Sequence, residues 1–165
     1  MSSSATTHQL LCRSLVEKAF NEGELDLLQL LMAPDAVDHG LTDFDASGER
    51  GPAPVQRFLR AFRFAFPDLR VTVMDQLADG DRVATRWRME GTQSNRLMGI
   101  EASRRFMSVE GIRIDRFHDG RIVETWNHWD TMSMLRQLGA LPALERHPAS
   151  ASPACEVDAP VLRLK

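Results

Sequence analysis

The chain has 165 residues, of which 43% are hydrophobic and 26% charged, enough for one compact domain with a sizeable core. Its net charge of −3 and the lack of a basic run give no electrostatic basis for nucleic-acid binding. The N-terminus, MSSSATTHQL, lacks the features of a signal peptide, and no apolar run approaches the roughly 20 residues that span a bilayer. We therefore expect a cytoplasmic protein, in which Cys12 and Cys155 form no disulfide.

Three helices are predicted in the first part of the chain. Apolar residues every four positions from Leu11 to Ala19 predict an amphipathic helix that ends near Gly23. The stretch ELDLLQLLM predicts a second, short helix, and residues 36–38 a short strand. A polar loop follows over residues 41–51, and a 3-1-3 spacing of apolar residues predicts a third helix from Pro52 to Phe64.

After residue 68 the apolar period changes from 3.6 to 2, which predicts strands. Alternation over residues 69–73 and 83–89, around the turn ADGD, predicts two of them, and FMSVEGIRIDRF and RIVETWNHWD predict two more. DTMSMLRQLG predicts a last helix that ends at Gly139. This order predicts an α+β fold with helices over one face of a curved antiparallel sheet. We expect a single domain over residues 1–144 and an extended or disordered tail over residues 145–165.

The loop after Phe117 decides which side chains of the last two strands face the core. A two-residue Asp119-Gly120 turn pairs His118 with Arg121, whereas a three-residue loop pairs Phe117 with Arg121. The hydrophobic pattern favours the three-residue loop. The face that we then expect to be buried carries Ile112, Ile114, Ile122 and Trp126 together with Arg116, Glu124, His128 and Asp130. The opposite face carries Arg113, Asp115, Thr125 and Asn127.

Several segments together resemble the SnoaL-like polyketide cyclases, or ester cyclases, of the nuclear transport factor two-like superfamily. These segments are VDHG, FPDL, VATRWRMEGT, GIRIDRFHDGRIVETWNHWD and MLRQLG, within residues 14–139 and most densely within residues 111–139. The resemblance implies a conical curved sheet wrapped by three N-terminal helices, a short C-terminal helix and a deep apolar pocket. It also implies an enzyme of antibiotic or secondary-metabolite biosynthesis that is often a homodimer or higher homo-oligomer.

The resemblance also implies an acid at the end of the last long strand that acts as general acid and base in an aldol ring closure. Asp130 matches that acid, His39 in VDHG matches a pocket histidine, and Arg116 matches another pocket position. The substrate-binding residues that we predict are Trp126, His128, Glu124, Ile112, Ile114, Met89, Trp87 and Phe62.

This chemistry needs a base that removes a proton next to a carbonyl and an acid that protonates the resulting alkoxide. One carboxyl group can do both, and an apolar pocket raises its pKa toward the useful range. Arg116 or His39 would stabilise the enolate oxygen. We expect no cofactor and no metal, because the sequence contains no HExxH, GxGxxG or P-loop motif. The expected partner is a bulky, largely apolar keto substrate, with neither nucleic acid nor membrane.

Other interpretations stay open at this point. Asp130 also precedes DTMSMLRQL and would be a good N-cap, Arg116 can pair with Glu124, and His128, His39 and Trp126 can be structural. A hydrolase, isomerase or dehydratase is an alternative use of the same pocket. Epoxide opening needs an Asp-Arg-Asp set. Arg116 and Asp130 offer two of its three members, but Asp115 would face outward in the favoured register. A domain that binds a ligand without turnover is the third possibility.

Overall fold

The computed structural model describes residues 3–41 and 47–142, so the predicted tail lies outside the described residues. The elements in chain order are helix α1 (Ser3–Ser14), the π-helical segment η1 (Leu15–Glu22), α2 (Leu27–Leu31), β1 (Met32–Asp38), α3 (Pro52–Ala65), β2 (Arg70–Asp79), β3 (Arg82–Thr92), β4 (Phe106–His118), β5 (Arg121–Trp129) and α4 (Thr131–Gln137). No helix among these residues is long and apolar enough to cross a membrane.

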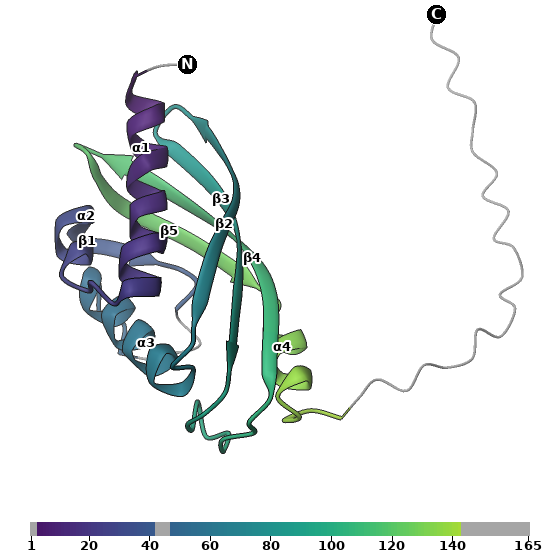
Figure 1. The fold of residues 1–165 in the computed structure, drawn as a ribbon. Helices are drawn as coiled ribbons and strands as arrows, with labels where there is room; N and C mark the ends of the chain where they lie inside the picture. The colour runs from purple at the N-terminus through teal and green to yellow at the C-terminus, as the bar shows by residue number, and fades with distance from the viewer. Residues whose placement is uncertain (1–2, 42–46, 143–165) are drawn as a thin grey trace, which may run out of the picture.

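Five strands form one curved sheet in the order β1-β5-β4-β3-β2. From β2 to β5, each strand pairs antiparallel with the next strand along the chain, whereas β1 lies parallel to β5. Helix α1 runs across one side of the sheet, and α2 and α3 lie on the same side beside β1 (Figure 1). The predicted α+β fold, with helices over one face of a curved sheet and a short C-terminal helix, is confirmed.

The first helix ends where the sequence predicts. Gly23 has the left-handed φ of 78° that caps a helix C-terminus, and its N–H bonds the Lys18 carbonyl. From α3, Arg63 Nη1 donates to the carbonyl oxygens of Phe20 and Asn21 at 2.7 and 2.6 Å. The wider π-helical turns of η1 are thus fixed at their end by a charged donor, which holds Phe20 in place.

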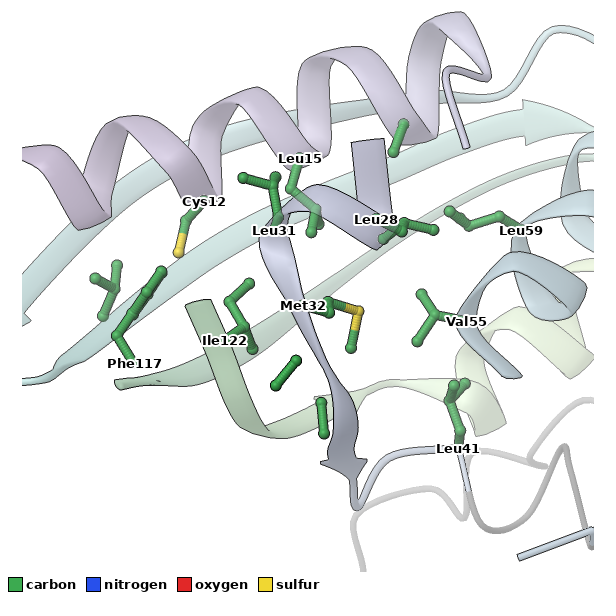
Figure 2. Close-up of a cluster of buried hydrophobic side chains, with 14 residues drawn as sticks. Cys12, Leu15, Leu28, Leu31, Met32, Leu41, Val55, Leu59, Phe117 and Ile122 are labelled. Carbon is green, nitrogen blue, oxygen red and sulfur yellow. The ribbon is translucent and has the colours of Figure 1, made fainter. Parts of the chain in front are cut away.

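The core between helices and sheet has two parts. One joins α1, α2 and α3 to the sheet through apolar side chains that point toward one another (Figure 2), namely Cys12, Leu15, Leu28, Leu31, Met32, Leu41, Val55, Leu59, Phe117 and Ile122. The other gathers around Phe62, Phe66 and Met107 and includes Met134 of α4 and Leu138, which directly follows that helix. The sheet face turned toward the helices is therefore the buried one.

The hairpin register that we favoured is wrong. Asp119 and Gly120 have φ of 48° and 74°, as in a two-residue turn whose twist matches that of the strands, and His118 pairs with Arg121. The register then shifts between Arg116 and Phe117, so that Arg116 lies opposite Glu124. The two-residue turn therefore puts Ile122 beside Phe117 on the buried face, and the extra residue Val123 then puts Glu124 opposite Arg116.

The assignment of the two faces is also wrong. The face that carries Ile112 and Ile114 points away from the helices, and Ile112 is 52% exposed. Arg113 and Asp115, predicted on the solvent side, are buried. The buried side chains of β4 are instead those at the odd positions Met107, Val109, Gly111, Arg113, Asp115 and Phe117. We call this the inner face of the sheet, and the opposite one its outer face.

Candidate active site

A hollow on the inner face lies between the sheet, η1 and α3. Its empty space is about 370 Å³, counting the part at its mouth that is open to solvent. It is lined by Val16, Phe20, Phe58, Val71, Trp87, Met89, Arg113, Asn127 and Trp129. Seven of these nine side chains are apolar or aromatic, so the two polar ones, Arg113 and Asn127, determine what a ligand must present.

Gly111 allows the two tryptophans of the hollow to lie where they do. It pairs with Trp87 on one side and with Trp129 on the other. A Cβ at this position would lie 2.4 Å from Trp87 Cζ2 and 2.7 Å from Trp129 Cβ. Only glycine therefore lets both indoles pack over β4. The rings of Phe62 in α3 and Trp129 pack edge to face, with their centroids 5.8 Å apart.

A buried polar network occupies the inner face next to the hollow. Arg113 Nε donates to both oxygens of Asp115 at 2.8 and 2.9 Å, with the two side chains 5% and 1% exposed. Thr125 Oγ1 donates to Asp115 at 2.7 Å and accepts from Arg113 Nη2 at 3.1 Å. Cys12 Sγ of α1 lies 3.5 Å from Asp115 Oδ2. Every atom of the carboxylate that can accept a hydrogen bond is thus occupied.

The network fixes the charge state of its members. Burial alone would lower the pKa of Arg113, but the charge and hydrogen bonds of Asp115 raise it, so the guanidinium stays protonated. Burial and the neighbouring Asp115 charge raise the pKa of the Cys12 thiol, which stays protonated and is a poor nucleophile. The network is therefore a static pair of charges.

Asp38 is a second acid on the inner face. β1 pairs with β5 so that Asp38 lies beside Thr125, and it lines a neighbouring hollow of about 660 Å³ rather than the one that Arg113 lines. Burial raises its pKa, and the charge of Arg113 opposes that shift in part. Oδ1 accepts from the Gly40 N–H at 2.9 Å, while Oδ2 makes no hydrogen bond with the described residues. This carboxyl group can still gain and lose a proton.

Asp130 does not lie in the hollow. It is exposed, and its Oδ1 accepts from the Ser133 N–H at 2.8 Å as the N-cap of α4. Its expected position on a buried face is thus wrong, because that face of β5 is the outer one. The capping role that the sequence left open is present in the structure.

The other two predicted catalytic residues meet on the outer face. His39 Nε2 lies 2.9 Å from Glu124 Oε1, and Arg116 donates to Glu124 Oε2 from Nε and Nη2 at 2.9 and 2.8 Å. The ring of His39 stacks on Trp126 with centroids 5.2 Å apart. His39 and Arg116 both lower the pKa of Glu124. The sequence thus predicted residues that do lie together, but on the wrong side of the sheet.

The remaining predicted residues divide between the two faces. Trp87 and Met89 line the hollow, as expected for a pocket wall. Phe62 is buried and lines a separate groove beside α3. Ile112, Ile114 and His128 lie on the outer face.

Sequence reasoning missed Asp38, Arg113, Asp115 and Asn127 as site residues. The apolar alternation of Met107, Val109 and Phe117 was the available signal, because these share the parity of Arg113 and Asp115. No such signal marks Asp38, which reaches the site only through the pairing of β1 with β5. Among the described residues, no group of three or more histidine, cysteine, aspartate or glutamate side chains is arranged to hold a metal ion.

A family model described as SnoaL-like polyketide cyclase matches residues 10–138. The chain belongs to this family. IdmH from Streptomyces antibioticus, a proposed polyketide cyclase, is 38% identical with a TM-score of 0.69, covering 79% of this chain and 97% of its own. TsrD from Streptomyces laurentii is 28% identical with a TM-score of 0.74, and the match covers 86% of this chain and 99% of TsrD.

AclR from Streptomyces galilaeus, a proposed hydroxylase, is also 28% identical, with a TM-score of 0.72 and coverage of 84% of this chain and 99% of its own. No match to the chain was found among curated proteins. The SnoaL-like fold is thus shared by relatives whose descriptions name different reactions. The site, rather than the fold, must distinguish between them.

Replacing Asp115 tests the buried pair. Asp115→Asn leaves the Arg113 guanidinium buried without a counter-charge, and we expect it to lower the free energy of unfolding by about 3 kcal/mol. The matched control is Glu110→Gln, which removes an acid paired with Arg88 on the outer face, where water replaces the interaction. Urea denaturation should show a far smaller change for the control. Equal losses in the two variants would contradict the structural role of the buried pair.

Asp38 should make stability depend on pH in a defined direction. Its folded-state pKa is raised, so the folded protein binds the proton more tightly than the unfolded chain does. Stability from this group is present below its ordinary pKa of 3.8 and is lost as the pH rises through the folded-state value. Asp38→Asn, which can still accept from Gly40, should therefore unfold at a higher temperature than the parent at pH 7. The difference should vanish near pH 3.5.

Proposed function

We propose that this SnoaL-like protein closes a ring in a polyketide or similar bulky keto substrate by an intramolecular aldol reaction, with Asp38 as the acid and base. The observation that carries the proposal is the state of Asp38, a half-buried acid on the inner face whose pKa is raised by burial. A carboxylate with a raised pKa is a stronger base, and its acid form persists closer to neutral pH. Both properties are needed by a group that first removes and later returns a proton.

Arg113 supplies the complementary charge. Its Nε and Nη2 atoms are bonded within the network, whereas Nη1 makes no hydrogen bond with the described residues. Because Arg113 lines the hollow, Nη1 is available to an oxygen that becomes negative as an enolate or alkoxide forms. The donor is held in place before the reaction by Asp115, so little reorganisation is needed.

The other two acids are less suited to this role. Asp115 is almost fully buried, and both of its oxygens already accept from Arg113 Nε, so it serves as the counter-charge of the guanidinium. Asp130 is exposed to water, and its Oδ1 already accepts from the Ser133 N–H as the N-cap of α4. Asp38 therefore takes the acid and base role for which Asp130 was predicted.

Exchange of α-protons tests the first half of the reaction without the natural substrate. 1-Tetralone, a bicyclic aryl ketone, incubated with the protein in D₂O should lose its α-proton NMR signals faster than in buffer alone. Asp38→Asn should lower the protein-catalysed rate by about 100-fold or more, since it removes a general base. The rate in the parent protein should rise with pH through a value above the ordinary pKa of an aspartate.

Asp130→Asn is the matched control, because asparagine caps a helix about as well as aspartate. We expect it to keep the exchange rate of the parent within about twofold. Loss of exchange in Asp130→Asn together with its retention in Asp38→Asn would reverse the assignment. Binding of tetralone with no exchange in any variant would instead indicate a binding domain.

Epoxide opening is the second candidate, and one observation favours it. The Asp-Arg-Asp set seemed incomplete when Asp115 was expected outside, yet Asp115, Arg113 and Asp38 share the inner face. In such a reaction water attacks an epoxide carbon while Asp38 takes its proton, and the epoxide oxygen leaves as an alkoxide that gains a proton from solvent or an acid. The near-complete burial of Asp115 makes direct contact with a substrate harder, which ranks this reaction second.

Cyclohexene oxide in H₂¹⁸O separates the two candidates. For the cyclase we expect no diol beyond the buffer rate, together with tetralone exchange. Labelled diol formed by the parent and lost in Asp38→Asn, without tetralone exchange, would favour the epoxide reaction. Mass spectrometry of the diol measures both the yield and the incorporated oxygen.

A further inference from the structure

The side-chain oxygen of Asn127 is an unexplained acceptor in the hollow. Oδ1 is shielded from water and has no hydrogen-bond partner among residues 3–41 and 47–142, while the residue itself lines the cavity. A buried carbonyl oxygen without a donor is unusual, because forming no bond forfeits the hydration that the group has in the unfolded chain. Such an atom at a cavity wall indicates a donor that arrives with a ligand.

The backbone prevents Asn127 from moving to find another partner. β5 is bonded on one side to β4, where Asn127 pairs with Arg113, and on the other side to β1. The loop after β1 closes over Asn127. A Cβ on Gly40 would lie 2.4 Å from the backbone carbonyl oxygen of Asn127 and 2.9 Å from the Cβ of Asn127. The backbone and Cβ of Asn127 are therefore held in position before any ligand binds.

The surroundings define the chemistry of the ligand. The polar lining consists of Arg113, which only donates, and Asn127, whose unpaired atom accepts. Phe20, Trp87 and Trp129 supply aromatic walls on which a flat ring can pack. A matching ligand thus has a flat apolar body, a hydroxyl that donates to Asn127 and a carbonyl or enolate oxygen that accepts from Arg113.

We infer that Asn127 is a specificity-determining residue that accepts a hydrogen bond from a phenol or enol hydroxyl, so that the ligand class is a hydroxyaryl or enolised cyclic ketone. This inference deepens the proposed function and rests on it for the identity of the cavity. It concerns binding alone, however, and is tested without turnover. An isolated ketone would leave the Asn127 acceptor unpaired and would bind less tightly.

Isothermal titration calorimetry with 2-naphthol and 2-methoxynaphthalene tests the inference, because the two probes share the ring system but only naphthol donates. The parent protein should bind naphthol about tenfold more tightly, as one net hydrogen bond allows. Asn127→Leu, of similar volume, should bind both probes with similar affinity, and its affinity for methoxynaphthalene should stay within about twofold of the parent. Asn127→Asp, which keeps an acceptor, should retain the preference for naphthol even if the leucine variant does not fold.

Asp38→Asn separates this inference from the proposed reaction. It should bind both probes as the parent does while failing to exchange tetralone, so loss of catalysis and loss of recognition are distinct results. A parent protein without preference for naphthol, or a preference that persists in Asn127→Leu, would overturn the inference. So would tighter binding of 2-acetylnaphthalene than of naphthol that is lost in Asn127→Leu, because the amide would then present its NH₂ group.

Discussion

The buried ion pair between Arg113 and Asp115 is the interaction on which the inner face depends. Two charges that are 5% and 1% exposed are tolerated only while each compensates the other and while their remaining polar atoms are bonded. Thr125 and Cys12 complete those bonds from β5 and α1. The pair therefore joins helix and sheet, orients the guanidinium toward the hollow, and leaves both oxygens of its own carboxylate occupied by hydrogen bonds.

The outer face follows from the same constraint. Side chains alternate along a strand, so a β4 that turns Arg113 and Asp115 inward must turn Arg116 outward, where it meets Glu124. His39 follows Asp38 in the chain and reaches the same glutamate, then stacks on Trp126. Histidine, glutamate and arginine together resemble a catalytic set, yet here they form a half-exposed cluster on the outer face of the sheet.

The sequence was informative where one physical effect determines the outcome. Helix and strand positions follow from periodicity, and the end of η1 follows from Gly23, which alone takes its backbone angle at no cost. The faces of β4 could not be judged from residues 112–115 alone, because there the inner face carries Arg113 and Asp115 and the outer face carries Ile112 and Ile114. This exchange of polar and apolar faces is local, since Met107, Val109 and Phe117 place apolar side chains on the buried inner face as usual. The bulge after Ile122 added a second shift that no short window reveals.

The acid expected at the end of the last long strand is absent from the inner face of that strand. There, β5 presents Thr125, Asn127 and Trp129, and the only acid nearby on its pairing partner β1 is Asp38. Parallel pairing thus supplies from one strand the carboxyl group that its neighbour lacks. In the function that we propose, Asn127 has a different task, because an uncharged acceptor next to Arg113 can select a hydroxyl without competing with Asp38 for the proton. Acid and recognition group are separated onto two strands, which lets each be tuned by its own surroundings.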